Sequence, residues 1–578
     1  MSTTTTPTPL GRAAAGTADY LDQRTGLGVA VKTFARKIFP DHWSFLLGEI
    51  ALFSFVTLLI SGVFLTMFFV PSMAETHYTG PWDSLNGVQM SEAFSSTLRL
   101  SFEVRGGLLM RQIHHWAALI FMASIVTHMM RVFFTGAFRK PRELNWVVGF
   151  TLLILGLLAG FSGYSLPDDV LSGNGLRITD GVIKAVPIIG SYASYFVFGG
   201  EFPGQDLIPR LFTVHVLLVP ALILALIGLH LLFVVLHKHT QYPGSGRKDT
   251  NVVGFPLFPI YVAKAGGYFF TVFGVIALMA ATMSINPVWN YGPYDPSPVS
   301  AGAQPDWYML FLEGSLRLMP GGAEFVTWGN FTVSLNVIIP AMIVPGVLFT
   351  LLAVYPFVEA AVTGDKREHH VLDRPRNRPF RTSFGVAVLV AFFILVLAGS
   401  NDLIATHFHL SINDITWVFR VLFFVGPWLA FIITKRICLG LQRKDRELVL
   451  HGHETGRIVR FASGEYIEVH KPLDAHERWL RVQHDNIRPL EIEPAEDARG
   501  VRRKGYQVDR IRQRLSQVFY EDRVEPVTPS ELAAAHAHGH GEHDEIAADS
   551  HEPAQVGGGT HLVEPEGETT TDGRNPQV

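Results

Sequence analysis

Four histidines lie within long apolar segments, and their spacing suggests a shared chemistry. His114 and His128 are fourteen residues apart in one segment, and His215 and His230 are fifteen apart in another. Fourteen residues of helix advance about 21 Å and turn by only about 40°, so both histidines of a segment share a face at two depths. Separated imidazole pairs suit haem iron, whereas zinc would need a tighter cluster of ligands. The spacing predicts two bis-histidine haem sites.

Two details of these segments need their own interpretation. His115 lies about 140° around the helix from the second histidine of its segment, so we assign it to packing and its neighbour His114 to ligation. In the second segment the additional residue turns the pair by about 60°. Pro220 lies between these two histidines, and we expect it to kink the helix enough to compensate.

Glycines in two other apolar segments repeat the fourteen-residue spacing. They are Gly48 and Gly62 in the first segment of the chain, and Gly149 and Gly163 in the third. Glycine in membrane helices often serves close helix packing, and either pair alone fits that alternative. A flat macrocycle at each of two depths would also need bare backbone beside it. The matching periods favour glycines that flank two haems.

Arginines border the histidine segments. Arg111 and Arg131 border the first, and Arg210 precedes the second. Their guanidinium groups could pair with haem propionates. Arginines at the ends of membrane helices also reach for the water interface, so both roles stay open.

The composition is that of a polytopic membrane protein. Of 578 residues, 48% are hydrophobic and 17% are charged, and the mean hydropathy is +0.25. We predict an all-α membrane protein with eight transmembrane helices, four of which form a di-haem bundle. The apolar runs are 44–70, 112–135, 145–165, 212–236, 265–285, 332–357, 383–400 and 416–437.

Basic residues predict the topology. Lys and Arg cluster after the second, fourth, sixth and eighth runs. By the positive-inside tendency, this pattern places both termini in the cytoplasm. We expect the chain to lie in the plasma membrane. Binding of RNA could explain one basic loop but not this alternation, so we expect no nucleic-acid partner. His114 and His215 then lie near the outer face and His128 and His230 near the inner face, with roughly 20 Å between the irons.

Two loops carry groups that could move protons. In the outer loop 286–331, Asp306 and Glu313 lie beside interfacial aromatics that include Tyr308, and a carboxylate there could accept a proton from a bound reductant. In the inner loop, His237, His239 and Lys264 form a basic rim that could supply protons. Ordinary charged residues on an inner surface would look the same.

The cysteine count limits the metal centres that this chain can hold. The single cysteine, Cys438, excludes a cysteine-ligated iron–sulfur cluster or a covalently bound haem in this chain.

The tract AAAHAHGHGEHDE near the C-terminus could bind metal, but a solvated tail is the more ordinary interpretation. We also expect a disordered N-terminal tail. The expected segments are an N-terminal segment (1–43), a four-helix di-haem domain (44–263), a second four-helix membrane domain with the PDWY loop (264–437) and a polar C-terminal extension (438–578).

These motifs together resemble the cytochrome b subunit of the cytochrome bc complexes, the quinol:cytochrome c reductases. The resemblance covers roughly 35–437 and rests on RQIH with a second histidine fourteen on, RLFTVH with a second fifteen on, GYSLPDD, AVPIIG and PDWY. It implies a low-potential haem b outside (His114, His215) and a high-potential haem b inside (His128, His230). One electron of an outer quinol would go to a Rieske partner and one through both haems to an inner quinone, moving protons in a Q cycle.

Departures from the family refine this expectation. Asp306 stands where relatives more often have a longer glutamate, and Ala265 replaces an acid of mitochondrial relatives after Lys264, which leaves Lys264 and His237 as modest inner-site candidates. The fifteen-residue spacing is similar to the plastid and Gram-positive branch of the family. Eight spans in one chain with a long polar extension are most similar to actinobacterial enzymes. That likeness implies menaquinol, a c-type cytochrome subunit, a homodimeric complex and a supercomplex with a terminal oxidase.

Two other classes of protein remain as alternatives. A proton-coupled secondary transporter could use intramembrane histidines, but it gives no reason for the matched glycines. A haem b membrane anchor of a dehydrogenase shares the histidine pairs but does not call for PDWY.

Overall fold

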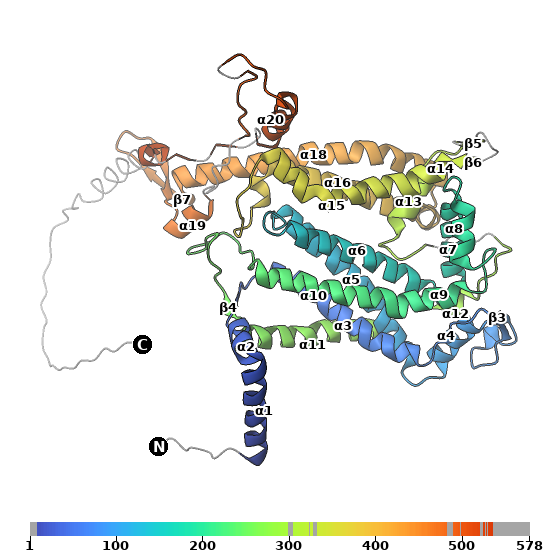
Figure 1. Ribbon diagram of the computed structural model, residues 1–578. Coiled ribbons are helices and arrows are strands. Elements are labelled where there is room, and N and C mark those ends of the chain that lie inside the picture. The colour runs from blue at the N-terminus through green and yellow to red at the C-terminus, as the bar shows by residue number, and fades with distance from the viewer. Residues whose placement is uncertain are drawn as a thin grey trace, which may run out of the picture. The chain divides into compact units, whose positions relative to one another are not determined.

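The computed structural model has a mainly helical architecture (Figure 1). The residues it describes are 8–298, 304–322, 324–326, 332–481, 489–496, 499–520, 524–525, 527–528 and 530–535.

Eight helical spans in this described part are long and apolar enough to cross a membrane, which confirms the predicted all-α membrane fold. Several spans combine an α-helix with a tighter or wider turn. In chain order they are Trp43–Thr66 (η1, Trp43–Phe45; α3, Leu46–Thr66), Gly107–Phe134 (α5), Glu143–Tyr164 (α6), Leu207–Leu236 (α9, Leu207–Thr213; η3, Val214–Leu218; α10, Val219–Leu236), Leu257–Thr282 (η4, Leu257–Tyr261; α11, Val262–Thr282), Leu335–Thr363 (α14, Leu335–Ile338; η5, Ile339–Ile343; α15, Val344–Thr363), Pro379–Gly399 (α16) and Ile412–His451 (α18).

The first four spans enclose one apolar core. Phe55 of α3, Phe121 of α5, Leu153 of α6 and Ile223 of α10 are buried in a single cluster. Tyr308, from the loop after span five, is buried in the same cluster. The four helices that carry the histidines and glycines therefore form one bundle, and the loop with Tyr308 packs against it.

The later spans form a second group. Phe311 of α13 (Leu310–Leu318), Ile394 of α16 and Phe419 of α18 share another buried cluster. In Figure 1 these helices lie along the bundle formed by the first four spans.

Short helices lie in the connections between the spans. They are α4 (Glu92–Phe102), α7 (Val170–Lys184), α8 (Gly190–Phe198), α12 (Val288–Tyr291) and α17 (Asn401–Phe408). Asp169 caps the N-terminus of α7, and its carboxylate accepts from the Leu171 backbone N–H at 3.2 Å. Two strand pairs, β2–β3 (Glu75–His77, Gln89–Ser91) and β5–β6 (Glu324–Val326, Thr332–Ser334), lie in loops.

The N-terminal region differs from the expected disordered tail. From Pro9 onward it forms two helices, α1 (Pro9–Thr25) and α2 (Leu27–Ala35), because this stretch is rich in alanine and other good helix formers. Strand β1 (Ile38–Phe39) then pairs with β4 (Phe255–Pro256), just before span five.

The C-terminal extension contains two parts. Helix α18 continues past the apolar run to His451, and a separate compact unit follows with the hairpin β7–β8 (His453–Arg460, Tyr466–Lys471) and α19 (Ala475–Arg481). Helix α20 (Tyr506–Tyr520) belongs instead to the unit of the membrane helices. Most of the histidine-rich tract and the acidic tail lie outside the described residues.

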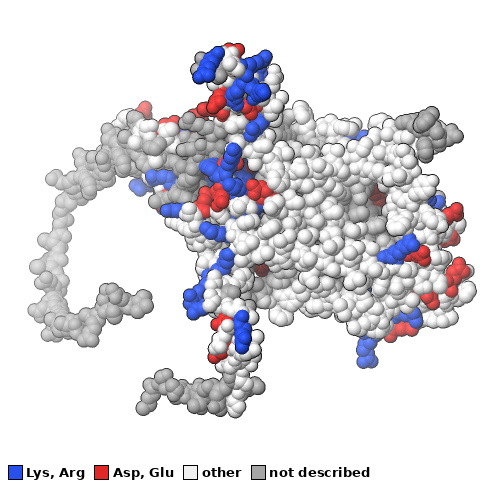
Figure 2. Space-filling view, viewed as in Figure 1, with Lys and Arg blue, Asp and Glu red and all other residues white. Residues whose placement is uncertain are grey.

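Charged side chains gather at the ends of the membrane helices. Figure 2 shows Lys and Arg in a band across one end of the membrane helices, whereas the middle of the bundle is almost uncharged on this face. With eight spans, both ends of the membrane region lie on the same side.

Candidate functional site

The four histidines meet as two pairs, each formed by one helix of span two and one of span four. The ring centroids of His114 and His215 are 6.1 Å apart, and those of His128 and His230 are 6.3 Å apart. Two metal–imidazole bonds of about 2 Å each, plus the distance from each nitrogen to its ring centre, give a separation of about this size. The geometry of both pairs fits an iron held between two axial imidazoles.

A π-helical turn compensates for the additional residue in span four. Residues Val214–Leu218 form this turn, which contains His215 and ends two residues before Pro220. A π-bulge accommodates one extra residue in an otherwise α-helical span and is often found at functional sites. The distortion predicted for Pro220 therefore takes the form of a wider turn next to the proline.

Each of the four predicted glycines lies against one of the histidines. A Cβ added to Gly48 would lie 3.2 Å from His128 Cε1, and one on Gly62 would lie 3.3 Å from His114 Cε1. On the opposite side, a Cβ added to Gly149 would lie 3.6 Å from His230 Cε1, and one on Gly163 would overlap the His215 ring. The glycines thus provide room at the depths of the histidine pairs.

The histidines of the His114–His215 pair form hydrogen bonds through Nδ1. His114 Nδ1 lies 2.9 Å from Ser61 Oγ, and His215 Nδ1 lies 3.0 Å from the carbonyl oxygen of Ala159. Bonds of this kind fix the ring and leave Nε2 available to a metal. Among the described residues, Nδ1 of His128 and Nδ1 of His230 have no such partner although both are buried.

A large cavity joins the His114–His215 pair to the PDWY loop. Its total empty volume, including the part open to the outside, is about 1550 Å³. His114 and His215 line it together with Asp306 and Tyr308. The buried hydroxyl group of Tyr164 also lines it and has no hydrogen-bond partner among the described residues.

Asp306 is held by two side chains at the wall of this cavity. Its Oδ1 lies 3.1 Å from His115 Nε2, and its Oδ2 accepts from the Tyr308 hydroxyl at 3.0 Å. The assignment of His115 to packing is therefore wrong, because its ring points to the polar loop instead of the apolar core. The HH doublet in RQIHHW was the only signal for this role. Burial, together with the Asp306 carboxylate, raises the pKa of Tyr308 well above its usual value, so it acts as a neutral donor.

The three predicted arginines differ in their surroundings. Arg111 lines the cavity and donates to the Asn286 carbonyl at 2.7 Å, while its buried Nε has no hydrogen-bond partner in the part of the chain that the structure describes. Arg131 lies 4.3 Å from the Phe45 ring centroid, and its buried Nε and Nη2 have no partner among the described residues. Arg210 does not line the cavity and pairs with Asp206 at 3.2 Å. Unpartnered buried guanidinium nitrogens fit a carboxylate ligand at Arg111 and Arg131.

The predicted inner-site residues Lys264, His237 and His239 form no polar contact with one another among the described residues. Lys264 Nζ forms an exposed ion pair with Asp41 at 2.6 Å. His237 stacks on Phe233, and its buried Nδ1 has no partner among the described residues. Burial and the nearby arginine charges lower the pKa of His239 to about 4, so this residue is neutral near pH 7 and adds no charge to the rim.

Comparison with known proteins gives consistent matches. Residues 119–293 match the family described as "Cytochrome b(N-terminal)/b6/petB". The chain is 56% identical over 535 residues to the cytochrome bc1 complex cytochrome b subunit of Streptomyces coelicolor, which covers 91% of this chain and 98% of that protein. It is 49% identical over 488 residues to the subunit of the same name from Mycobacterium tuberculosis, covering 84% of this chain and 88% of the relative.

A solved structure shares the fold. The structure titled "Hyperthermophilic respiratory Complex III" matches with a TM-score of 0.55 and 24% identity, over 73% of this chain and 99% of the other. The sequence identity to the Streptomyces and Mycobacterium subunits extends over nearly their whole length. The chain therefore belongs to the family of cytochrome b subunits of cytochrome bc1 complexes.

Proposed function

We propose that this chain oxidises quinol at the outer face of the membrane, as the cytochrome b subunit of a respiratory quinol:cytochrome c reductase. The observation that supports this most directly is the single cavity that His114 and His215 share with Asp306 and Tyr308. A quinol in this cavity would lie beside both an electron acceptor and a carboxylate. Neither a secondary transporter nor a dehydrogenase anchor needs that combination.

Two haem b groups fit the histidine pairs. His114 and His215 would hold the outer, low-potential group, and His128 and His230 the inner, high-potential group. When bound, the groups supply one-electron carriers between the two sides of the membrane. Gly48, Gly62, Gly149 and Gly163 leave room beside the rings, and Arg111 and Arg131 offer buried guanidinium nitrogens to the propionates.

Asp306 accepts a proton from the bound quinol in this proposal. Tyr308 donates to one carboxylate oxygen and His115 contacts the other, so both hold the carboxylate at the cavity wall. A positioned carboxylate at hydrogen-bond distance is the requirement for a general base. The shorter side chain of Asp306, compared with the glutamate of many relatives, makes its two supports more important.

On the inner side we propose quinone reduction near His128 and His230. Lys264 and His237 are the proton donors in this proposal. Lys264 is exposed and paired with Asp41, which allows exchange of protons with water.

The partners follow from what the chain lacks. With one cysteine, buried Cys438, it cannot ligate an iron–sulfur cluster itself. We therefore propose that a Rieske protein takes one electron of the quinol and passes it to a c-type cytochrome subunit. In this proposal the complex is a homodimer in the plasma membrane, oxidises menaquinol and assembles with a terminal oxidase. Both termini of this chain lie in the cytoplasm. The segments 1–43, 44–263, 264–437 and 438–578 are its functional divisions.

Purification of the complex from its native membrane tests this proposal. The expected result is a dithionite-reduced spectrum of haem b, a co-purifying Rieske protein and menaquinol:cytochrome c activity. A haem b protein that co-purifies with a dehydrogenase and no Rieske protein would contradict it.

A further inference from the structure

Helix α20 of the C-terminal extension is docked at the ends of spans six and seven. Arg512 donates through Nε and Nη2 to the carbonyl oxygen of Ala361 in α15, at 3.0 and 2.9 Å. The Phe519 ring lies 5.5 Å from that of Phe380 in α16. These contacts come from the same compact unit, so α20 is part of the membrane region and not of the separate hairpin unit.

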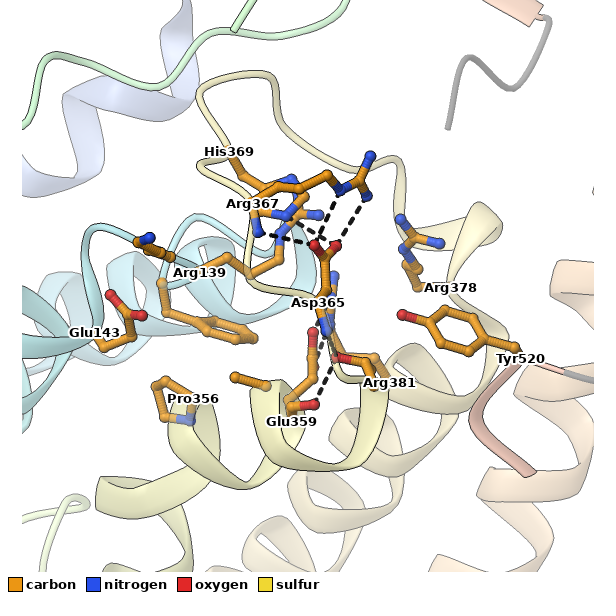
Figure 3. A pocket seen from close by; sticks show the side chains of 14 residues that line it. Arg139, Glu143, Pro356, Glu359, Asp365, Arg367, His369, Arg378, Arg381 and Tyr520 are labelled. Carbon is orange, nitrogen blue, oxygen red and sulfur yellow. Dashed lines mark hydrogen bonds and ion pairs between the residues drawn. The ribbon is translucent and has the colours of Figure 1, made fainter. Parts of the chain in front are cut away.

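The last residue of α20 closes a small cavity at this end of the spans (Figure 3). The cavity has about 410 Å³ of empty volume, including its open part. Its acid Asp365 is paired with Arg367 at 2.9 Å and with His369 at 3.0 Å. Burial raises the pKa of Tyr520 to about 12, so its phenol stays neutral there. Tyr520 at the end of α20 is therefore seated at a cavity whose acid Asp365 is already paired.

A different face of α20 exposes an apolar stripe. Val508, Ile511, Leu515 and Val518 are 61%, 58%, 47% and 50% exposed. Their spacing of three, four and three residues places them on one side of the helix. The buried Ser516 marks the docked side. Four large apolar side chains in a row at this exposure indicate that something other than water covers them.

Basic side chains border this stripe. Arg510 and Arg514 are exposed and lie about 100° around the helix from its centre. Arg502 and Lys504, just before the helix, are exposed as well. An apolar face next to a basic face is the pattern of helices that lie in a membrane interface.

We propose that the exposed face of α20 lies in the headgroup region of the bilayer that α15 and α16 cross, and binds anionic lipid there. The docking contacts hold α20 beside the ends of these two spans, at the level where their connecting loop carries five Lys and Arg residues between 366 and 378. Figure 2 shows Lys and Arg gathered in a band at this end, together with Asp and Glu. The apolar stripe enters the boundary of the acyl chains, and the arginines pair with lipid phosphates. This proposal is independent of the redox function.

Site-directed spin labelling of the full chain in its purified complex tests the lipid contact. The labels are placed by Ile511→Cys or Leu515→Cys in a Cys438→Ala background, and Arg510→Cys on the basic face is the matched control. The Cys438→Ala chain without an introduced cysteine is treated with the same label and gives the background signal. The complex is studied in nanodiscs of phosphatidylcholine with phosphatidylglycerol and in nanodiscs of phosphatidylcholine alone.

With phosphatidylglycerol, the ratio of oxygen to nickel-chelate accessibility should be higher at 511 and 515 than at 510 by about threefold or more. The double variant Arg510→Gln/Arg514→Gln, labelled at 515, and the phosphatidylcholine nanodiscs should both reduce that ratio. Equal, water-like accessibility at the labelled positions would overturn the proposal. Labels at 511 and 515 that are immobilised and shielded from both reagents would overturn it in favour of a protein partner.

Discussion

His115 Nε2 lies 3.1 Å from Asp306 Oδ1, although 191 residues separate the two in the chain. His115 is the immediate neighbour of His114, whose ring faces His215. One turn of α5 therefore presents one histidine to the predicted haem and the next to the loop that carries the proposed proton acceptor.

Replacing Asp306 by asparagine should slow quinol oxidation by about 10²-fold or more, because the amide cannot accept the proton. Stopped-flow reduction of the complex by menaquinol measures this rate. Asp295→Asn, in the same loop and fully exposed, is the matched control and should leave the rate unchanged. An Asp306→Asn complex with an unchanged rate would reduce this residue to a loop contact.

The adjacent histidines should give opposite results on replacement. His114→Gln should remove the outer haem, whereas His115→Gln should retain both haems and lower quinol oxidation by about tenfold through loss of a support for Asp306. The haem content of each purified variant, measured by pyridine haemochrome, separates the two roles. Loss of haem from His115→Gln would reverse our assignment.

Gly163→Ala should disrupt the outer histidine pair, because the added methyl group would overlap the His215 ring. The expected result is loss or distortion of one haem signal in the reduced spectrum. Gly228→Ala in span four is the control, since a Cβ there meets nothing within 4 Å. Equal spectra of the two variants would show that Gly163 serves helix packing alone.

Asp168 should make the stability of the complex depend on pH. Burial raises its pKa to about 7, partly offset by a hydrogen bond from Ser91. Its folded-state pKa lies above the unfolded value of about 3.9, so its contribution is fully present below about pH 4 and is lost as pH rises through about 7, by at most about 4 kcal/mol. Thermal inactivation midpoints should fall between pH 5.5 and 8, and Asp168→Asn should flatten that fall. An unchanged slope in the variant would assign the pH dependence to other groups.

The periodic features of the fold could be predicted from the sequence. Hydropathy predicted the eight spans, and helical arithmetic predicted which histidines and glycines share a depth, because both depend on residues close together in one helix. The form of the distortion in span four was not predictable, since Pro220 is compatible with a kink or with a wider turn.

Contacts between distant segments were beyond these patterns. Nothing in helix periodicity links His115 to Asp306, and the charge of Arg512 gave no sign that it bonds to Ala361 in another helix. Such contacts depend on how loops and the extension return to the bundle, which one sequence without its fold does not specify.

The central claim is that two haem sites at different depths depend on separate histidine pairs. The most direct test is the haem content and reduced spectrum of His128→Ala. We predict loss of the inner haem alone, with the outer haem retained and electron transfer to the inner quinone blocked. A variant that keeps both haems would contradict the account.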